Sequence, residues 1–191
     1  LALHTALYIP GTLALLVSPS LRQSSELFKR VSNLYHRDKT IEAESESALR
    51  LELENGSRIL SLPGSEKTIR GYSSVDILII DESARVDDAL YKTVRPMLAV
   101  SGGRLLALST PFGKRGWWFE AWQSKNWERY KIPATQCPRI SEDFLAEERR
   151  ELGAWWFEQE YMCIFRERSG RVFGFELLQQ AQSEEVETWA I

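Results

Sequence analysis

Residues 75–82 read Val-Asp-Ile-Leu-Ile-Ile-Asp-Glu, so that four consecutive apolar residues run directly into two adjacent acids. A short, continuous apolar run of this kind is typical of a strand that is buried on both faces, as in a parallel sheet. We therefore expect a buried strand from Val75 to Ile80, with Asp81 and Glu82 at its carboxyl end. Ligands of open α/β sheets gather at that end of the strands, which makes the acid pair a candidate site.

The two acids suit nucleotide hydrolysis, because neighbouring side chains at the end of an extended strand point in different directions. One carboxylate can hold Mg²⁺, directly or through its waters, while the next polarises the attacking water. In this interpretation Asp81 is the metal residue and Glu82 is the catalytic base. The alternative is an ordinary acid pair that caps a helix or lies on the surface, and this short motif alone does not decide between them.

Two further apolar runs, Leu13–Val17 and Leu105–Leu108, have the same character and are also expected to be buried strands. Between the strands, apolar residues recur at helical spacing. The predicted helices are residues 1–8, 20–35 (with Leu21, Phe28, Val31 and Leu34 on its apolar face), 87–98, 116–124 and 141–165. Alternating residues around Asn55-Gly56 predict a hairpin over residues 48–63, and a last strand is expected at 128–132. This alternation favours a three-layer α/β fold with a mostly parallel central sheet.

Length and composition narrow the class of protein. At 191 residues the chain can bury a substantial core. The formal net charge of -3 shows no overall excess of positive charge for nucleic acid, and the two cysteines and two histidines have no metal-binding spacing. No apolar run approaches the ~18 residues that a membrane helix needs, so we expect no membrane partner. The tryptophans are expected to pack in the core.

A second set of polar residues follows the third apolar run. Ser109 and Thr110 can hydrogen-bond an attacking water or a γ-phosphate, and Pro111 closes the segment; the alternative is an ordinary strand-to-loop turn. Arg70, twelve residues before Glu82, could stabilise charge on a transferring phosphoryl group. Its alternative is a solvated surface arginine.

Several segments together resemble the large subunits of phage and prophage terminases. They are residues 68–73 (TIRGYS), 75–82, 91–98 (YKTVRPML), 105–111 (LLALSTP) and 113–116 (GKRG), with residues 13–28 and 157–173 extending the likeness over nearly the whole chain. The resemblance implies a RecA-like P-loop NTPase fold with a catalytic glutamate. It also implies a motor that uses ATP and Mg²⁺ to package double-stranded DNA into a procapsid.

The resemblance assigns residues and partners as well. Asp81 matches the Walker B metal residue and Glu82 the catalytic glutamate, while Arg70 matches an arginine thought to reach a neighbouring subunit's ATP. Ser109, Thr110 and Pro111 match the motif that couples hydrolysis to movement. The implied partners are DNA, a portal protein and a terminase small subunit. A homo-oligomeric ring on the portal, in the host bacterial cytoplasm, is also implied.

The phosphate-binding loop of the family is the main departure. The pattern G-x-x-x-x-G-K-[ST] does not occur in the 191 residues. Because the loop precedes a helix like residues 1–8 in the family, we expect it, and the first strand, upstream of residue 1. Phosphate affinity comes largely from that loop, so the 191 residues alone are expected to bind ATP poorly and hydrolyse it negligibly. The nuclease is expected beyond Ile191.

We expect a partial ATPase core over residues 1–140, a helical subdomain or linker over 141–175 and a C-terminal linker over 176–191. Two other functions remain open at this point. One is a helicase-like translocase, which needs a second RecA-like domain. The other is a non-catalytic prophage remnant or assembly module, which the missing loop favours.

Overall fold

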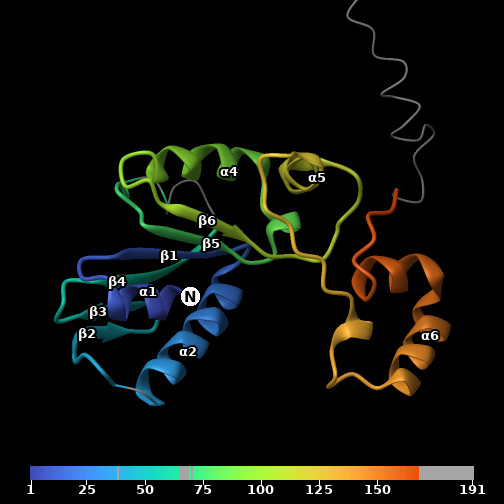
Figure 1. Ribbon diagram of the computed structural model, residues 1–191, viewed down its shortest axis with the longest axis horizontal. Coiled ribbons are helices and arrows are strands. Elements are labelled where there is room, and N and C mark those ends of the chain that lie inside the picture. Colours follow the sequence, from blue (N-terminus) through green and yellow to red (C-terminus); the bar gives the residue numbers. More distant parts are fainter. Residues whose placement is uncertain (38, 65–68, 70, 168–191) are drawn as a thin grey trace, which may run out of the picture. The chain divides into compact units, whose positions relative to one another are not determined.

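The computed structural model describes residues 1–37, 39–64, 69 and 71–167 of the chain (Figure 1). They form two compact units. Unit 1 comprises Leu1–Ser109 and Gly116–Trp118, and unit 2 comprises Thr110–Arg115 and the chain from Phe119 onward. Among the described residues, no helix combines the length and the apolar character that crossing a membrane requires.

Unit 1 is built around one sheet. Its strands are β1 (Leu13–Ser18), β2 (Ala43–Ser47), β3 (Arg50–Leu53), β4 (Arg58–Pro63), β5 (Ile77–Ile80) and β6 (Arg104–Ala107). Its helical elements are α1 (Ala2–Tyr8), α2 (Leu21–Arg37), η1 (Ser83–Arg85), α4 (Asp88–Val94) and η2 (Arg95–Leu98). Helix α5 (Gly116–Gln123) begins in unit 1 and ends in unit 2.

The strands lie in the order β2-β3-β4-β1-β5-β6. Strands β4, β1, β5 and β6 run parallel to one another, whereas β3 is antiparallel to both β2 and β4. The mostly parallel α/β sheet expected from the sequence is confirmed, as is the hairpin around Asn55-Gly56.

Helices cover both faces of this sheet, as the apolar runs require. Figure 1 shows α1 and α2 on one side and α4 on the other. Ala14 and Leu16 of β1 belong to the cluster beneath α1 and α2. The alternate residues Leu15 and Val17 are also fully buried, as a strand covered on both faces demands.

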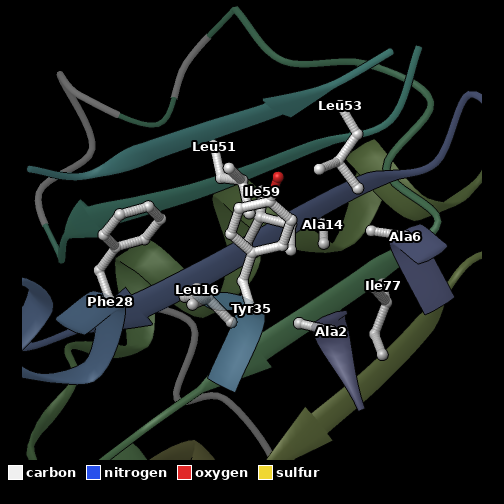
Figure 2. Close-up of a cluster of buried hydrophobic side chains, with 10 residues drawn as sticks. All are labelled: Ala2, Ala6, Ala14, Leu16, Phe28, Tyr35, Leu51, Leu53, Ile59 and Ile77. Atoms are coloured by element: carbon white, nitrogen blue, oxygen red, sulfur yellow. The ribbon is translucent and has the colours of Figure 1, made fainter. Parts of the chain in front are cut away.

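The core between the sheet and the first two helices draws on six elements (Figure 2). It consists of Ala2, Ala6, Ala14, Leu16, Phe28, Tyr35, Leu51, Leu53, Ile59 and Ile77. The Tyr35 hydroxyl donates to the Ile41 carbonyl at 3.0 Å, so its one polar atom is paired. Burial, followed by the Glu42 carboxylate, raises the pKa of Tyr35. Helix α2 begins after Ser20, whose hydroxyl oxygen accepts the Gln23 N–H at 3.3 Å, as expected for a cap.

Some local predictions for unit 1 are wrong. Leu21 and Leu34 are 57% and 55% exposed, because α2 presents Phe28 and Tyr35 to the sheet instead. Strand β6 is only half-buried, since it pairs with β5 alone among the described strands. Strand β2 escaped prediction because its Ala-Glu-Ser-Glu-Ser sequence has no apolar face, and hydrogen bonds to β3 hold it instead.

Unit 2 contains η3 (Ala134–Gln136) and α6 (Glu142–Glu160). Ser141 caps α6, because its hydroxyl oxygen accepts the Phe144 N–H at 3.2 Å. Gly153 has φ 74° and ψ 161° and divides α6 into two segments at a kink. That backbone region is essentially restricted to glycine.

Two predictions for unit 2 are wrong. Helix α6 ends at Glu160 rather than at Phe165. The strand expected at 128–132 is irregular chain, and Tyr130 and Ile132 are exposed, so no buried face exists to favour a strand there. The tryptophans are less buried than expected: Trp117 is 4% exposed, but Trp156 is 47% exposed. The division at residue 140 stays a prediction, and residues 176–191 lie outside the described part of the chain.

Candidate functional site

The candidate site lies where β1, β5 and β6 end side by side in unit 1. The sheet register aligns Val17, Ile80 and Ala107 across the three parallel strands. The next residue on the central strand is Asp81, whose N–H donates to the Val17 carbonyl at 2.8 Å. Ser18, the last residue of β1, lies on the adjacent strand. The residues after the strand ends are therefore gathered at one edge of the sheet.

Asp76, at the other end of β5, helps to set this alignment. Its carboxylate accepts the Leu13 N–H at 2.7 Å, and its own N–H donates to the Leu13 carbonyl at 3.0 Å. The Asp76 carbonyl accepts the Arg104 N–H at 2.9 Å. One residue thus connects the beginnings of β1, β5 and β6, which fixes where their carboxyl ends fall. Sequence reasoning missed it, because an acid inside an apolar run gives no sign of its partner.

The chain turns sharply at Glu82, which has φ 51° and ψ 43°. This left-handed conformation is uncommon for a residue with a Cβ atom. Ser83 explains how it is held. Its buried hydroxyl donates to the Ile80 carbonyl at 2.8 Å, and its N–H donates to the Leu108 carbonyl at 3.0 Å. Hydrogen bonds from Ser83 therefore hold the acid-bearing turn against the ends of both β5 and β6.

The Glu82 carboxylate is accessible. Its side chain is 39% exposed, and its Oε2 lies 3.6 Å from Nε of Arg85 in the turn η1. An exposed pair of this kind contributes ~1 kcal/mol or less. The ion pair therefore biases the direction of the Glu82 side chain without locking it.

Two buried hydroxyl groups at this edge lack a partner among the described residues. They are Oγ of Ser18, after β1, and Oγ of Ser109, after β6. Buried polar atoms are usually hydrogen-bonded, so each hydroxyl keeps an unused capacity for a hydrogen bond. Ser109 was predicted as a site residue, but Ser18 was not, because a serine that ends an apolar strand is common.

The other predicted site residues have different positions. Thr110 belongs to unit 2, where its hydroxyl donates to Oε2 of Glu160 at 3.0 Å. Pro111 is buried in the same unit. Arg70 lies outside the described residues. The structure thus brings Asp81, Glu82 and Ser109 to one edge of unit 1.

Comparisons with known proteins agree with this fold and with the resemblance of the sequence to terminase large subunits. The chain is 26% identical over 175 residues to the terminase large subunit of Escherichia phage T5, covering 86% of this chain and 40% of that protein. It therefore spans less than half the length of this curated relative.

Two solved structures are similar in fold. The large terminase ATPase domain of Thermus phage P74-26, in a mutant form, matches with a TM-score of 0.74 and 19% identity, covering 86% of this chain and 81% of that one. The large terminase of a thermophilic bacteriophage, in complex with ADP, matches with a TM-score of 0.69 and 11% identity, covering 83% of this chain and 42% of that one. At these identities the likeness establishes a RecA-like P-loop fold. None of the comparisons supports a helicase-like translocase or a non-catalytic remnant.

The model of one protein family, described as terminase large subunit, T4likevirus-type, N-terminal, matches residues 2–180. The match covers the sheet, the acid-bearing turn and helix α6. The chain therefore belongs to the N-terminal family of T4likevirus-type terminase large subunits.

Proposed function

We propose that this chain is the ATPase part of a large terminase, a motor that hydrolyses ATP to move double-stranded DNA into a procapsid. The observation that carries the proposal is the acid pair Asp81-Glu82 at the carboxyl edge of a parallel sheet, where ligands of such sheets bind. A related large terminase of similar fold has been solved with ADP bound.

The residues at this edge fit a magnesium ion that is shared with nucleotide. Among the described residues, no group of three or more His, Cys, Asp or Glu side chains could hold a metal by itself. Mg²⁺ in nucleotide sites usually takes one or two carboxylates, with waters and substrate phosphates completing its octahedron. Asp81 supplies such a carboxylate, and the unpartnered Ser18 hydroxyl is a further oxygen on the adjacent strand. When bound, the ion neutralises charge on the transferring phosphoryl group.

The remaining residues divide the work of hydrolysis. Glu82 orients the attacking water and takes its proton. The left-handed backbone of Glu82, held by Ser83, sets the direction in which its side chain leaves the chain. Ser109 senses the γ-phosphate through its unpartnered hydroxyl. Thr110 and Pro111 couple the loss of the γ-phosphate to movement of the motor. Arg70 stabilises the charge that develops on the γ-phosphate.

The full-length protein is proposed to work as a homo-oligomeric ring in the host bacterial cytoplasm, on a portal protein and with a terminase small subunit. These partners follow from the family and from the proposed motor activity. They are testable separately from ATP hydrolysis, by packaging assays with and without each component.

The test of the chemistry is Glu82→Gln in the full-length protein. A general base contributes roughly 10²–10⁴-fold to rate, so ATP turnover should fall by about that factor while binding of ATP is kept. Asp87→Asn is the matched control, because Asp87 is an exposed acid five residues away whose side chain makes no capping bond. If Glu82→Gln turns over ATP as fast as Asp87→Asn, Glu82 is not the base and the proposal fails.

A further inference from the structure

Thr110 makes a hydrogen bond that no part of the proposed chemistry requires. Its hydroxyl donates to Oε2 of Glu160 at 3.0 Å, and the other oxygen of the same carboxylate accepts from Nε2 of Gln159 at 3.2 Å. Gln159 is 1% exposed, and Glu160 is half-buried. Both residues lie at the end of helix α6, and Glu160 is fifty positions along the chain from Thr110.

This small polar cluster is a poor way to stabilise a fold. Oε1 of Gln159 is buried without a partner among the described residues, and a half-satisfied buried network is worse than an apolar contact. Glu160 also places a negative charge at the carboxyl end of a helix, where the helix dipole disfavours it. The unpartnered amide oxygen and the unfavourably placed charge argue that this contact has a working role beyond stability.

The chain passes from unit 1 to unit 2 between Ser109 and Thr110. Two adjacent hydroxyl residues therefore belong to different units. The Ser109 hydroxyl is buried in unit 1 and unpartnered among the described residues, whereas the Thr110 hydroxyl is held within unit 2 by Glu160. The peptide bond between Ser109 and Thr110 therefore joins two hydroxyl residues across the boundary between the units.

Inside unit 2, contacts join the two segments of α6. Glu160 ends the segment that follows the kink at Gly153. Tyr161 stacks on Phe157 at 5.3 Å between ring centroids, and its hydroxyl donates at 2.6 Å to Glu148, in the segment before the kink. This bond to the Glu148 carboxylate raises the pKa of Tyr161.

We propose that Glu160 is a positioning residue that holds the Thr110 hydroxyl and so transmits a nucleotide-dependent shift of Ser109 to helix α6. The inference rests on the proposed function, since it needs nucleotide at the edge formed by β1, β5 and β6. It adds the connection between the Ser-Thr-Pro segment and a specific helix, and it assigns that connection to one carboxylate.

The experiment compares amide hydrogen exchange of the full-length protein with Mg²⁺ and either ATP-γ-S or ADP. In the wild type, exchange in residues 154–160 should differ between the two nucleotides by about fivefold or more, the lower end of usual coupling between sites. Glu160→Ala should abolish that difference and leave the nucleotide-dependent difference in residues 77–85 in place. Glu160→Gln keeps a carbonyl oxygen for the Thr110 hydroxyl and should behave as the wild type.

Matched variants separate this role from a purely structural one. Glu151→Ala removes an exposed carboxylate from the same helix and should retain the α6 difference. Thr110→Val breaks the bond from its other side, and Thr110→Ser keeps it, so the pair remains informative if Glu160→Ala does not fold. An α6 difference that persists in both Glu160→Ala and Thr110→Val, or that is missing in the wild type, overturns the inference. Absence of any nucleotide effect in residues 77–85 would instead overturn the proposed function itself.

Discussion

Replacing Glu82 by glycine should stabilise the fold while it removes the proposed catalytic base. The reason is the backbone of this residue, at φ 51° and ψ 43°. A left-handed conformation costs an L-residue roughly 1–2 kcal/mol because its Cβ atom crowds the following carbonyl, and glycine avoids that cost.

The informative comparison is between Glu82→Gly and Glu82→Ala. Both lose the carboxylate and its 3.6 Å contact with Arg85, so the two differ only in the Cβ atom. At ordinary positions alanine is favoured over glycine by about 0.5–1 kcal/mol, because glycine loses more backbone freedom on folding. Here the backbone strain reverses the order. We expect the unfolding free energy of Glu82→Gly to exceed that of Glu82→Ala by about 1 kcal/mol, or about 2–4 °C in Tm.

Urea unfolding followed by circular dichroism measures this difference, provided that the dependence of the unfolding free energy on urea is unchanged between the variants. The same two substitutions at Glu120, an exposed residue within helix α5, serve as the control. There alanine should be the more stable by about 1 kcal/mol. The reasoning about Glu82 is refuted if alanine is also the more stable residue at position 82.

Two further predictions concern packing and pH. Gly103→Ala would place a Cβ atom 2.0 Å from the Val75 carbonyl oxygen, so we expect a loss of about 3 kcal/mol in unfolding free energy. Gly102→Ala meets no atom within 4 Å but has φ +63°, so its loss should be about 1 kcal/mol; equal losses in urea unfolding would contradict the clash. The Ser32 hydroxyl is the main cause of the lowered pKa of Glu46, and His36 lowers it as well. A lowered carboxyl pKa stabilises the fold at pH values above the ordinary carboxyl pKa, and this stabilisation is lost as the pH falls through the lowered pKa. Ser32→Ala should therefore raise the Glu46 pKa in an NMR titration and remove part of that acid-range contribution, and an unchanged pKa would exclude the hydroxyl as its cause.

Much of the fold was predictable because it depends on continuous apolar runs. Such runs can be stable only where both faces of a strand are covered, which is how β1 and β5 are buried. The same logic misjudged β6 and missed β2. Burial of β6 depends on its neighbours in the sheet, and β2 is held by hydrogen bonds rather than by apolar contacts.

The candidate site was predictable in its residues but not in its geometry. Asp81 and Glu82 were recognisable because acids directly after a buried strand are conspicuous. The left-handed turn at Glu82 was not, since no glycine or asparagine marks it. The contact between Thr110 and Glu160 joins residues fifty positions apart, and neither residue type implies the other.

The two edges of the sheet differ in how they resist association. Strand β2 presents alternating glutamate and serine to solvent, and charges on an edge discourage the pairing of another chain. Strand β6 instead ends in Leu105, Leu106 and Ala107, with no charge after Arg104 and no second neighbour among the described strands. Open backbone groups beside apolar side chains are a template for strand addition. Among the described strands, β6 is therefore the sheet edge that invites pairing with another chain, and a lysine at exposed Leu108 should discourage it.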